Sequence, residues 1–135
     1  MVVILALGLS GGALSAGPPR SVWKGVYTDT QSKRGKVEYD AVCAECHGPT
    51  LTGGDNVPDL SGDAFLANWD GLSAQDLFNR IRTTMPASKP GTLSDSATVE
   101  VMAYMFQVNR FPAGDTELPE DPGTLRQIAI TKTAP

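Results

Sequence analysis

The chain has 135 residues and a formal net charge of −4 at pH 7. This length suits a single domain with a modest core, because only longer chains divide into several cores. The negative charge argues against nucleic-acid binding, which would need a basic surface. With 14 glycines and 10 prolines, much of the chain is expected to be loop.

Residues 1–16 form an apolar stretch without a charged side chain, and small residues lie at its end. This pattern is typical of the apolar region and cleavage zone of a secretory signal. Because the usual basic start is missing, a retained anchor is the alternative. The stretch is shorter than the roughly 20 apolar residues of a spanning helix. We expect cleavage after Ser15 or Ala16, export to the periplasm or another extracytoplasmic compartment, and no membrane span in the mature chain.

A first helix is predicted from about Asp29 into the segment around residue 43. Thr28 and Gln31 have the spacing of a capping box, which is typical of a helix N-terminus. Gly35 and Tyr39 lie on the apolar face of this helix. A glycine inside a helix costs about 1 kcal/mol relative to alanine. Its presence therefore indicates a close approach of another backbone.

The pentapeptide Cys43-Ala44-Glu45-Cys46-His47 contains both cysteines and the only histidine of the chain. It matches the C-x-x-C-H pattern of covalent haem attachment. Residues three apart share one face of a helical turn, so Cys43 and Cys46 can each form a thioether with a haem vinyl group. His47 follows directly and brings an imidazole within reach of the iron. The motif predicts one covalently bound haem, haem c.

These residues allow three other interpretations. A thioredoxin-like pair would need a βαβ context and thiols of low pKa, and the surrounding sequence shows no βαβ alternation. A zinc site needs about four protein ligands, more than two cysteines and one histidine supply. A structural disulfide would leave His47 unexplained.

Gly48 and Pro49 are expected to end the first helix, and a turn-rich loop follows as far as Leu60. A short helix is predicted from Ser61. Another is predicted from Ser73, which has an acidic residue three positions later as in a capping box.

Residues 83–93 contain two prolines and a glycine and are predicted to form an irregular loop. Ser94 is expected to cap a last helix that ends near Asn109. The tail, residues 112–135, is rich in proline, and we expect it to lie on the surface or to be partly disordered, with Leu125 and Ile128 as docking residues. No convincing strand pair is recognised, so the fold class is predicted to be all-α.

A haem iron bound by one histidine has a further axial position, and its occupant decides between electron transfer and ligand chemistry. Met102 and Met105 lie on the last predicted helix, where core packing is the simpler interpretation. Met85 lies in a loop, and the following proline favours an extended backbone. Met85 is therefore the predicted second ligand. Histidine and methionine ligation raises the reduction potential and favours an electron carrier over a catalyst.

With these residues the chain resembles a class I monohaem cytochrome c over about residues 23–109. The resemblance depends on the C-x-x-C-H motif, on Gly35 with Tyr39, on the pair Met85-Pro86 and on Tyr104. It implies a domain at residues 17–111 with about four helices wrapped around one haem, and a crossing of the first and last helices at the glycine. It also implies that the carbonyl of Pro58 accepts the N–H of the axial histidine, which would fix its ring.

Three segments are similar to a subgroup of bacterial periplasmic cytochromes c that stand alone or serve quinoprotein dehydrogenases. They are residues 22–27, 65–69 and 82–86. The haem propionates would need donors, and Trp69 and Arg82 are the candidates, with Arg80 close by in sequence. Either arginine could instead be solvated helix surface.

The charges are unevenly distributed. No lysine or arginine occurs from Val37 to Asn79, while this stretch contains Glu38, Asp40, Glu45, Asp55, Asp59, Asp63, Asp70 and Asp76. Because Glu45 lies between the attachment cysteines, an acidic docking face for a redox partner with a basic patch is a hypothesis. A solvated surface that only aids solubility is the alternative.

The sequence therefore predicts an exported, non-enzymatic carrier of single electrons between a redox donor and acceptor. Two alternatives remain. The chain could be the cytochrome subunit of a periplasmic quinoprotein-type dehydrogenase, docked through its tail. It could also be a five-coordinate haem sensor or peroxidase in which Met85 is not bound to iron.

Overall fold

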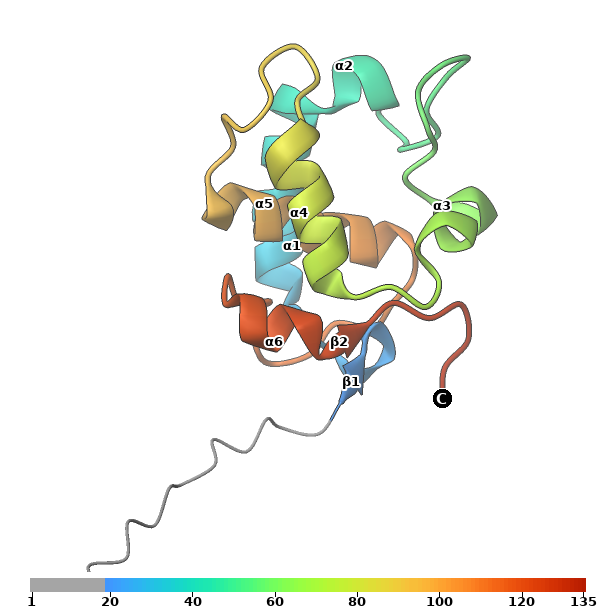
Figure 1. Ribbon diagram of the computed structural model, residues 1–135, viewed down its shortest axis with the longest axis vertical. Helices are drawn as coiled ribbons and strands as arrows, with labels where there is room; N and C mark the ends of the chain where they lie inside the picture. Colours follow the sequence, from blue (N-terminus) through green and yellow to red (C-terminus); the bar gives the residue numbers. More distant parts are fainter. Residues whose placement is uncertain (1–18) are drawn as a thin grey trace, which may run out of the picture.

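The computed structural model describes residues 19–135, in which six α-helices are joined by loops (Figure 1). The helices are α1 (Asp29–Val42), α2 (Ala44–His47), α3 (Gly62–Trp69), α4 (Ala74–Thr84), α5 (Asp95–Val108) and α6 (Pro122–Arg126). The 3₁₀ turn η1 (Val22–Lys24) and the strands β1 (Arg20–Ser21) and β2 (Ile128–Ala129) complete the secondary structure of this part. The predicted signal at residues 1–16 lies outside the described residues. In residues 19–135, no helix is long and apolar enough to cross a membrane.

The two longest helices, α1 and α5, pack against each other near their middles. A Cβ atom on Gly35 of α1 would collide with the backbone carbonyl of Glu100 in α5. The rings of Tyr39 and Tyr104 lie beside this point with their centroids 5.4 Å apart. The close backbone approach predicted from Gly35 is therefore confirmed.

Only one half of the predicted capping box forms at the start of α1. The Thr28 hydroxyl accepts a hydrogen bond from the backbone N–H of Gln31 at 3.1 Å. The Gln31 amide does not return to Thr28. It donates to the carbonyl of Leu118 at 2.9 Å and accepts from the N–H of Leu118 at 2.8 Å. Gln31 thus joins α1 to a segment far away in sequence, which a local pattern does not indicate.

The predicted first helix is interrupted at Cys43, where α1 has ended and the single turn α2 has not begun. Backbone hydrogen bonds still link the two. The Cys43 amide binds the carbonyl of Tyr39 at 2.8 Å, and the His47 amide binds the carbonyl of Cys43 at 2.9 Å. Gly48, with φ of 79°, follows α2 as its C-cap, so the predicted helix end is confirmed.

Helices α3 and α4 begin at the predicted serines. Ser61 occupies the N-cap of α3, although its hydroxyl makes no capping hydrogen bond. Ser73 and Asp76 form a complete capping box, in which the Asp76 N–H donates to the Ser73 hydroxyl at 3.2 Å and the Ser73 N–H donates to the Asp76 carboxylate at 2.8 Å. The loop after α4 begins at Met85, two residues later than predicted.

The tail is more ordered and more deeply packed than predicted. The described structure of this segment includes α6 and β2, and its side chains enter the core. The buried residues are Leu118, Leu125, Ile128 and Ile130. Two of them, Leu125 and Ile128, are the residues that the sequence indicated as docking. The expectation of a surface or partly disordered tail is wrong, because these apolar side chains have a core to cover.

The tail packs between the start of the described chain and the turn before α4 (Figure 1). Strands β1 and β2 pair in parallel, with Arg20 opposite Ile128. The Gly71 amide binds the carbonyl of Ile130 at 2.9 Å, and the Trp23 indole donates to the carbonyl of Thr131 at 2.9 Å. The all-α prediction is confirmed apart from this pair, whose strands are too short to give an alternating pattern.

Candidate functional site

A cavity of about 710 Å³ opens beside α4, bounded by α2, α3 and the loop that precedes α3. Four stretches of the chain and two residues of α5 line it. The lining residues are Val42, Cys43, Cys46 and His47; residues 56–60; Asn68, Trp69 and Leu72; Asp76, Leu77, Arg80, Ile81, Met85, Pro86 and Ala87; and Val101 and Met105. Well-packed interiors hold few voids larger than a water molecule. A cavity of this size is therefore suited to a bound group, within the roughly 300–1,000 Å³ of known ligand pockets.

His47 is buried at the cavity wall, 7% exposed. Its Nδ1 lies 3.0 Å from the carbonyl oxygen of Pro58, so the hydrogen bond implied by the family resemblance is present. A carbonyl can only accept, so Nδ1 carries the proton and, in the neutral ring, Nε2 keeps its lone pair. His47 therefore offers the cavity a nitrogen ligand whose ring orientation is fixed.

Both cysteines line the same cavity, and both are free. Cys43 is partly buried, and burial raises the pKa of its thiol to about 11, with a further contribution from Glu38. A thiol of this kind is not the low-pKa nucleophile of a thioredoxin-like pair. Among residues 19–135 no cluster of three or more histidine, cysteine or acidic side chains could bind a metal ion. Neither the thioredoxin-like nor the zinc interpretation gains support.

Met85 is the residue at which α4 ends and the following loop starts. Its backbone is extended, with φ of −116° and ψ of 152°, as the following proline predicted. The Met85 amide binds the carbonyl of Ile81 at 2.9 Å, and the Met85–Pro86 peptide bond is cis. The cavity thus brings His47 and Met85 together. Met105 also lines the cavity but is buried in the core on α5, and Met102 does not line it.

A search against protein-family models matches residues 30–105, more than half of the chain, to the family described as "Cytochrome C oxidase, cbb3-type, subunit III". The chain belongs to the cytochrome c family. Such domains carry out electron transfer with haem and are typically extracytoplasmic. The predicted resemblance to class I c-type cytochromes is confirmed at this level.

A comparison with solved structures shows the same fold in the sulfane dehydrogenase SoxCD from Paracoccus pantotrophus. The TM-score is 0.55 at 19% sequence identity, and the match covers 81% of this cytochrome but 63% of the other chain. At this identity the likeness establishes the fold alone. The cytochrome therefore spans less than two thirds of the matched dehydrogenase chain. No curated protein matches this sequence significantly.

The cavity of this cytochrome fits a haem on chemical grounds. Its wall offers an imidazole nitrogen and a thioether sulfur, two of the axial ligands that proteins provide to haem iron. The two thiols required for thioether bonds lie at the same wall, on and just before α2. Apolar side chains form much of the remaining lining, as a largely apolar macrocycle requires.

The two arginines near the end of α4 point to different neighbours. Arg80 lines the cavity, together with the predicted propionate donor Trp69. Arg82 does not line it. Its guanidinium binds the carboxylate of Asp95 and the carbonyl of Gly91, each at 2.7 Å. Two residues span about 200° around a helix, so the two side chains cannot face the same cavity. Of the two arginines, Arg80 lines the cavity and Arg82 does not.

Proposed function

We propose that this cytochrome is a carrier of single electrons with one haem c, attached through Cys43 and Cys46 and ligated by His47 and Met85. The observation that supports the proposal is that one cavity is lined by all four residues. Residues 1–16 would be the signal for export to the periplasm, residues 17–111 the haem domain, and residues 112–135 a tail folded onto it.

The bound haem would supply an iron that changes reversibly between two oxidation states. The protein residues would hold and tune it. The bond from Pro58 orients the His47 ring and increases its basicity. A thioether from Met85 would raise the reduction potential and leave no open coordination position for oxygen or peroxide. Trp69 and Arg80, which line the cavity, would donate hydrogen bonds to the propionates.

A spectroscopic experiment tests the ligation. The oxidised protein should show the weak far-red absorption band of iron–methionine charge transfer, and Met85→Ala should lack it. The reduced Met85→Ala protein should bind carbon monoxide readily at neutral pH, while the wild type should not. Met105→Leu is the matched control, because Met105 lines the same cavity but lies in the packed face of α5. A band that persists in Met85→Ala would contradict the assignment. Ready binding of carbon monoxide by the wild type would favour a sensor or peroxidase.

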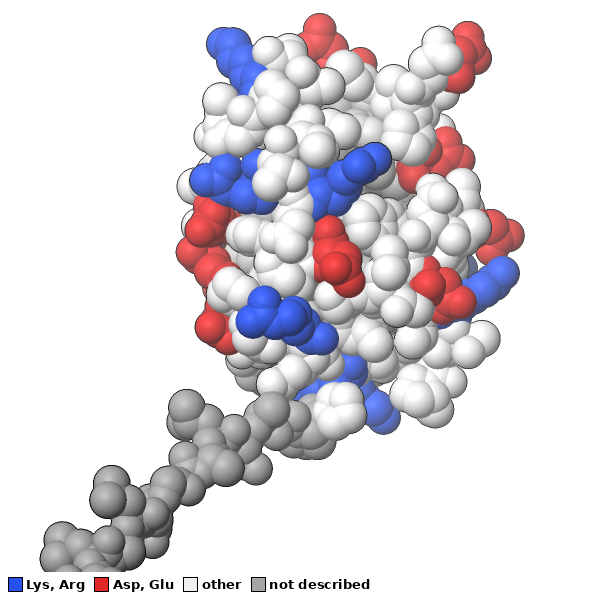
Figure 2. Space-filling model, viewed as in Figure 1, with Lys and Arg blue, Asp and Glu red and all other residues white. Residues whose placement is uncertain are grey.

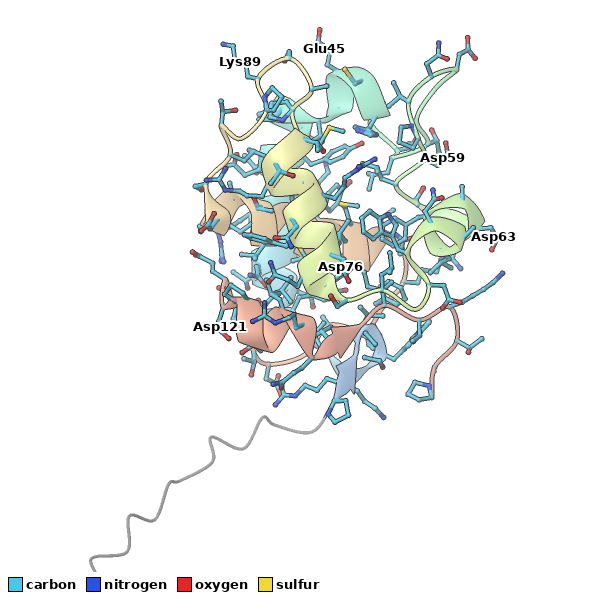
Figure 3. The ribbon with its side chains drawn as sticks, viewed as in Figure 1. Glu45, Asp59, Asp63, Asp76, Lys89 and Asp121 are labelled. Atoms are coloured by element: carbon cyan, nitrogen blue, oxygen red, sulfur yellow. The ribbon has the colours of Figure 1, made fainter. Side chains whose placement is uncertain are left out.

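Acidic side chains lie on the elements that bound the cavity and suit a redox partner with a basic patch. We define the acidic surface as Glu45, Asp59, Asp63 and Asp76; Figure 3 shows them on α2, beside α3, on α3 and on α4. Asp59 and Asp76 line the cavity. Within residues 19–135, none of the four forms an ion pair. Figure 2 shows acidic side chains at the top, right, centre and left edge of this face, with basic side chains interspersed among them. Such a charge pattern steers a partner more than it increases affinity.

Ionic strength tests the docking proposal. The rate of electron transfer to a small basic redox protein should fall as salt is added, because screening weakens steering. The double variant Glu45→Gln/Asp63→Asn should show a slower rate at low salt and a weaker salt dependence. Asp121→Asn, which removes a carboxylate at the N-cap of α6, is the control. A rate that does not change with salt would leave the acidic surface as a solvated surface only.

A second candidate function is that of a cytochrome subunit of a periplasmic dehydrogenase. The likeness in fold to a chain of the sulfane dehydrogenase SoxCD favours it. In that case the cytochrome should co-purify with a larger chain from its native compartment. Recovery as a free monomer would favour the independent carrier.

A further inference from the structure

Arg82 binds the loop that begins with Met85. This loop covers residues 85–93, between the end of α4 and the N-cap of α5. Arg82 donates from Nη1 to the carbonyl oxygen of Gly91 at 2.7 Å and from Nε to the carboxylate of Asp95 at 2.7 Å. One guanidinium thus joins the last turn of α4 to the far end of the loop and to the first turn of α5.

Few other polar contacts attach this loop to the rest of the protein. In the part of the chain that the structure describes, Arg82 is the only side chain from outside the loop with a hydrogen bond to the backbone of residues 85–93. The amide of Lys89 binds the carbonyl of Pro86 at 2.9 Å, which closes a turn within the loop. Leu93 is buried at the far end. The loop is therefore held by Met85 and Leu93 at its ends and by Arg82 across it.

We propose that Arg82 is a positioning residue that keeps this loop closed and thereby holds the Met85 thioether at the cavity. The inference depends on the proposed function, in which Met85 is an iron ligand. Arg82 acts through the loop and does not line the cavity. Its planar guanidinium can bind two acceptors at fixed angles, which a lysine ammonium does less well. Because the Arg82–Asp95 ion pair is partly exposed, its loss should affect the loop more than the stability of the whole fold.

A competing ligand measures how often the loop opens. Imidazole added to the oxidised haem-loaded protein can bind the iron only when Met85 has left it, so its apparent affinity is proportional to the open fraction. The loss of a hydrogen bond changes such an equilibrium by about two- to tenfold. Arg82→Gln should therefore bind imidazole about two- to tenfold more tightly than the wild type. Arg82→Lys should lie between them, because it keeps the charge but not the fork.

Arg34→Gln is the matched control. The Arg34 guanidinium also makes two polar contacts, here ion pairs with Glu100 at 2.6 Å and Glu117 at 2.9 Å. It reaches α5 as Arg82 does, but it makes no hydrogen bond to the loop. Both variants should show similar small decreases in unfolding temperature, while only Arg82→Gln should change the imidazole affinity. Asp95→Asn gives a second, milder test that keeps the bond to Gly91, and it should tighten imidazole binding by a smaller factor.

The outcomes separate this inference from the proposed function. If the wild type shows the far-red band and Arg82→Gln binds imidazole no more tightly than Arg34→Gln, the positioning role is overturned and the ligation by Met85 stands. If the wild type lacks the band, both proposals are overturned.

Discussion

The crossing of α1 with α5 and the cavity beside α4 are packed in opposite ways, although α5 contributes to both. At the crossing, the backbones are so close that Gly35 has no room for a Cβ atom. In the cavity, about 710 Å³ lies among largely apolar side chains. Val101 of α5 lines the cavity, and Tyr39 of α1 donates from its hydroxyl to the carbonyl of Gly48 at 2.7 Å, directly after α2.

The difference indicates that the two regions have different roles: the crossing positions the haem-attachment motif, and the cavity binds the haem. Protein atoms alone complete the crossing, which can therefore fix the direction of α1 and the position of the motif at its end. The side chains of the cavity wall gain contacts on their cavity side only from a bound group. We call the packed pair α1 and α5 the frame. If the two roles are correct, the frame should be stable without haem, while the elements around the cavity should depend on haem for their stability.

The largest effect is expected from removal of the haem. The double variant Cys43→Ser/Cys46→Ser, isolated without haem, should be less stable by more than about 4 kcal/mol, because a large apolar surface loses its contacts. Hydrogen exchange should show the loss mainly in α3, α4 and residues 56–60, which contribute to the cavity wall. Amides in α1 and α5 should keep more protection. Equal loss of protection in all helices would contradict the division into frame and cavity.

The second effect is expected at the crossing. Gly35→Ala should lower the free energy of unfolding by about 3 kcal/mol, because the new Cβ forces two backbones apart in a packed region. Urea unfolding of the haem-loaded protein measures it. Gly54→Ala is the control, since a Cβ there meets nothing within 4 Å, and it should change stability by less than about 0.5 kcal/mol. Similar values for the two variants would show that the crossing can adjust.

The sequence predicted the features that depend on neighbouring residues. The capping box of Ser73 and Asp76 and the N-cap of α5 at Ser94 are local patterns, and both are confirmed. Gly35 was also informative, because a glycine in a helix has few explanations other than close packing. The C-x-x-C-H motif was sufficient to predict a c-type cytochrome, which the family match confirms.

The features that sequence reasoning missed depend on contacts between distant segments. Nothing local shows that the Gln31 amide binds Leu118 or that the tail pairs with residues 20–21. The sequence could also have indicated that Arg80 faces the cavity, since it is three residues after Leu77 and shares its helix face, and both residues line the cavity. The roles of the individual haem-site residues remain predictions.

A third prediction concerns the attachment of the tail to the frame. Gln31→Ala should lower the free energy of unfolding by about 2 kcal/mol, because it leaves the buried N–H and carbonyl of Leu118 without partners. Gln107→Ala is the matched control. The Gln107 side chain also binds a segment far away in sequence, here joining α5 to α1, but it is exposed, so its loss should cost less than about 1 kcal/mol. If Gln31→Ala and Gln107→Ala lower the free energy of unfolding equally, the burial of Leu118 does not add to the energy of the Gln31 contact.

The smallest effect concerns alkaline stability, which the packed region should determine. Burial raises the pKa of Tyr27 to about 12 and also raises the pKa of Tyr39. Above about pH 10 the unfolded chain releases these phenolic protons while the folded protein keeps them. The unfolded state then binds fewer protons, so the contribution of these tyrosines to stability is constant below about pH 10 and is lost as pH rises further. For one tyrosine the fall is at most about 1.4 kcal/mol per pH unit.

The variant Tyr27→Phe separates the phenol from the general effect of alkali. It loses the hydrogen bond from the Tyr27 hydroxyl to the carbonyl of Phe111 at 2.7 Å, so it should be less stable near neutral pH by about 1 kcal/mol. Its stability should then fall less steeply than that of the wild type above about pH 10, because one titrating group is gone. Urea unfolding at a series of pH values measures both differences. Parallel curves for the two proteins would mean that alkaline loss of stability begins elsewhere.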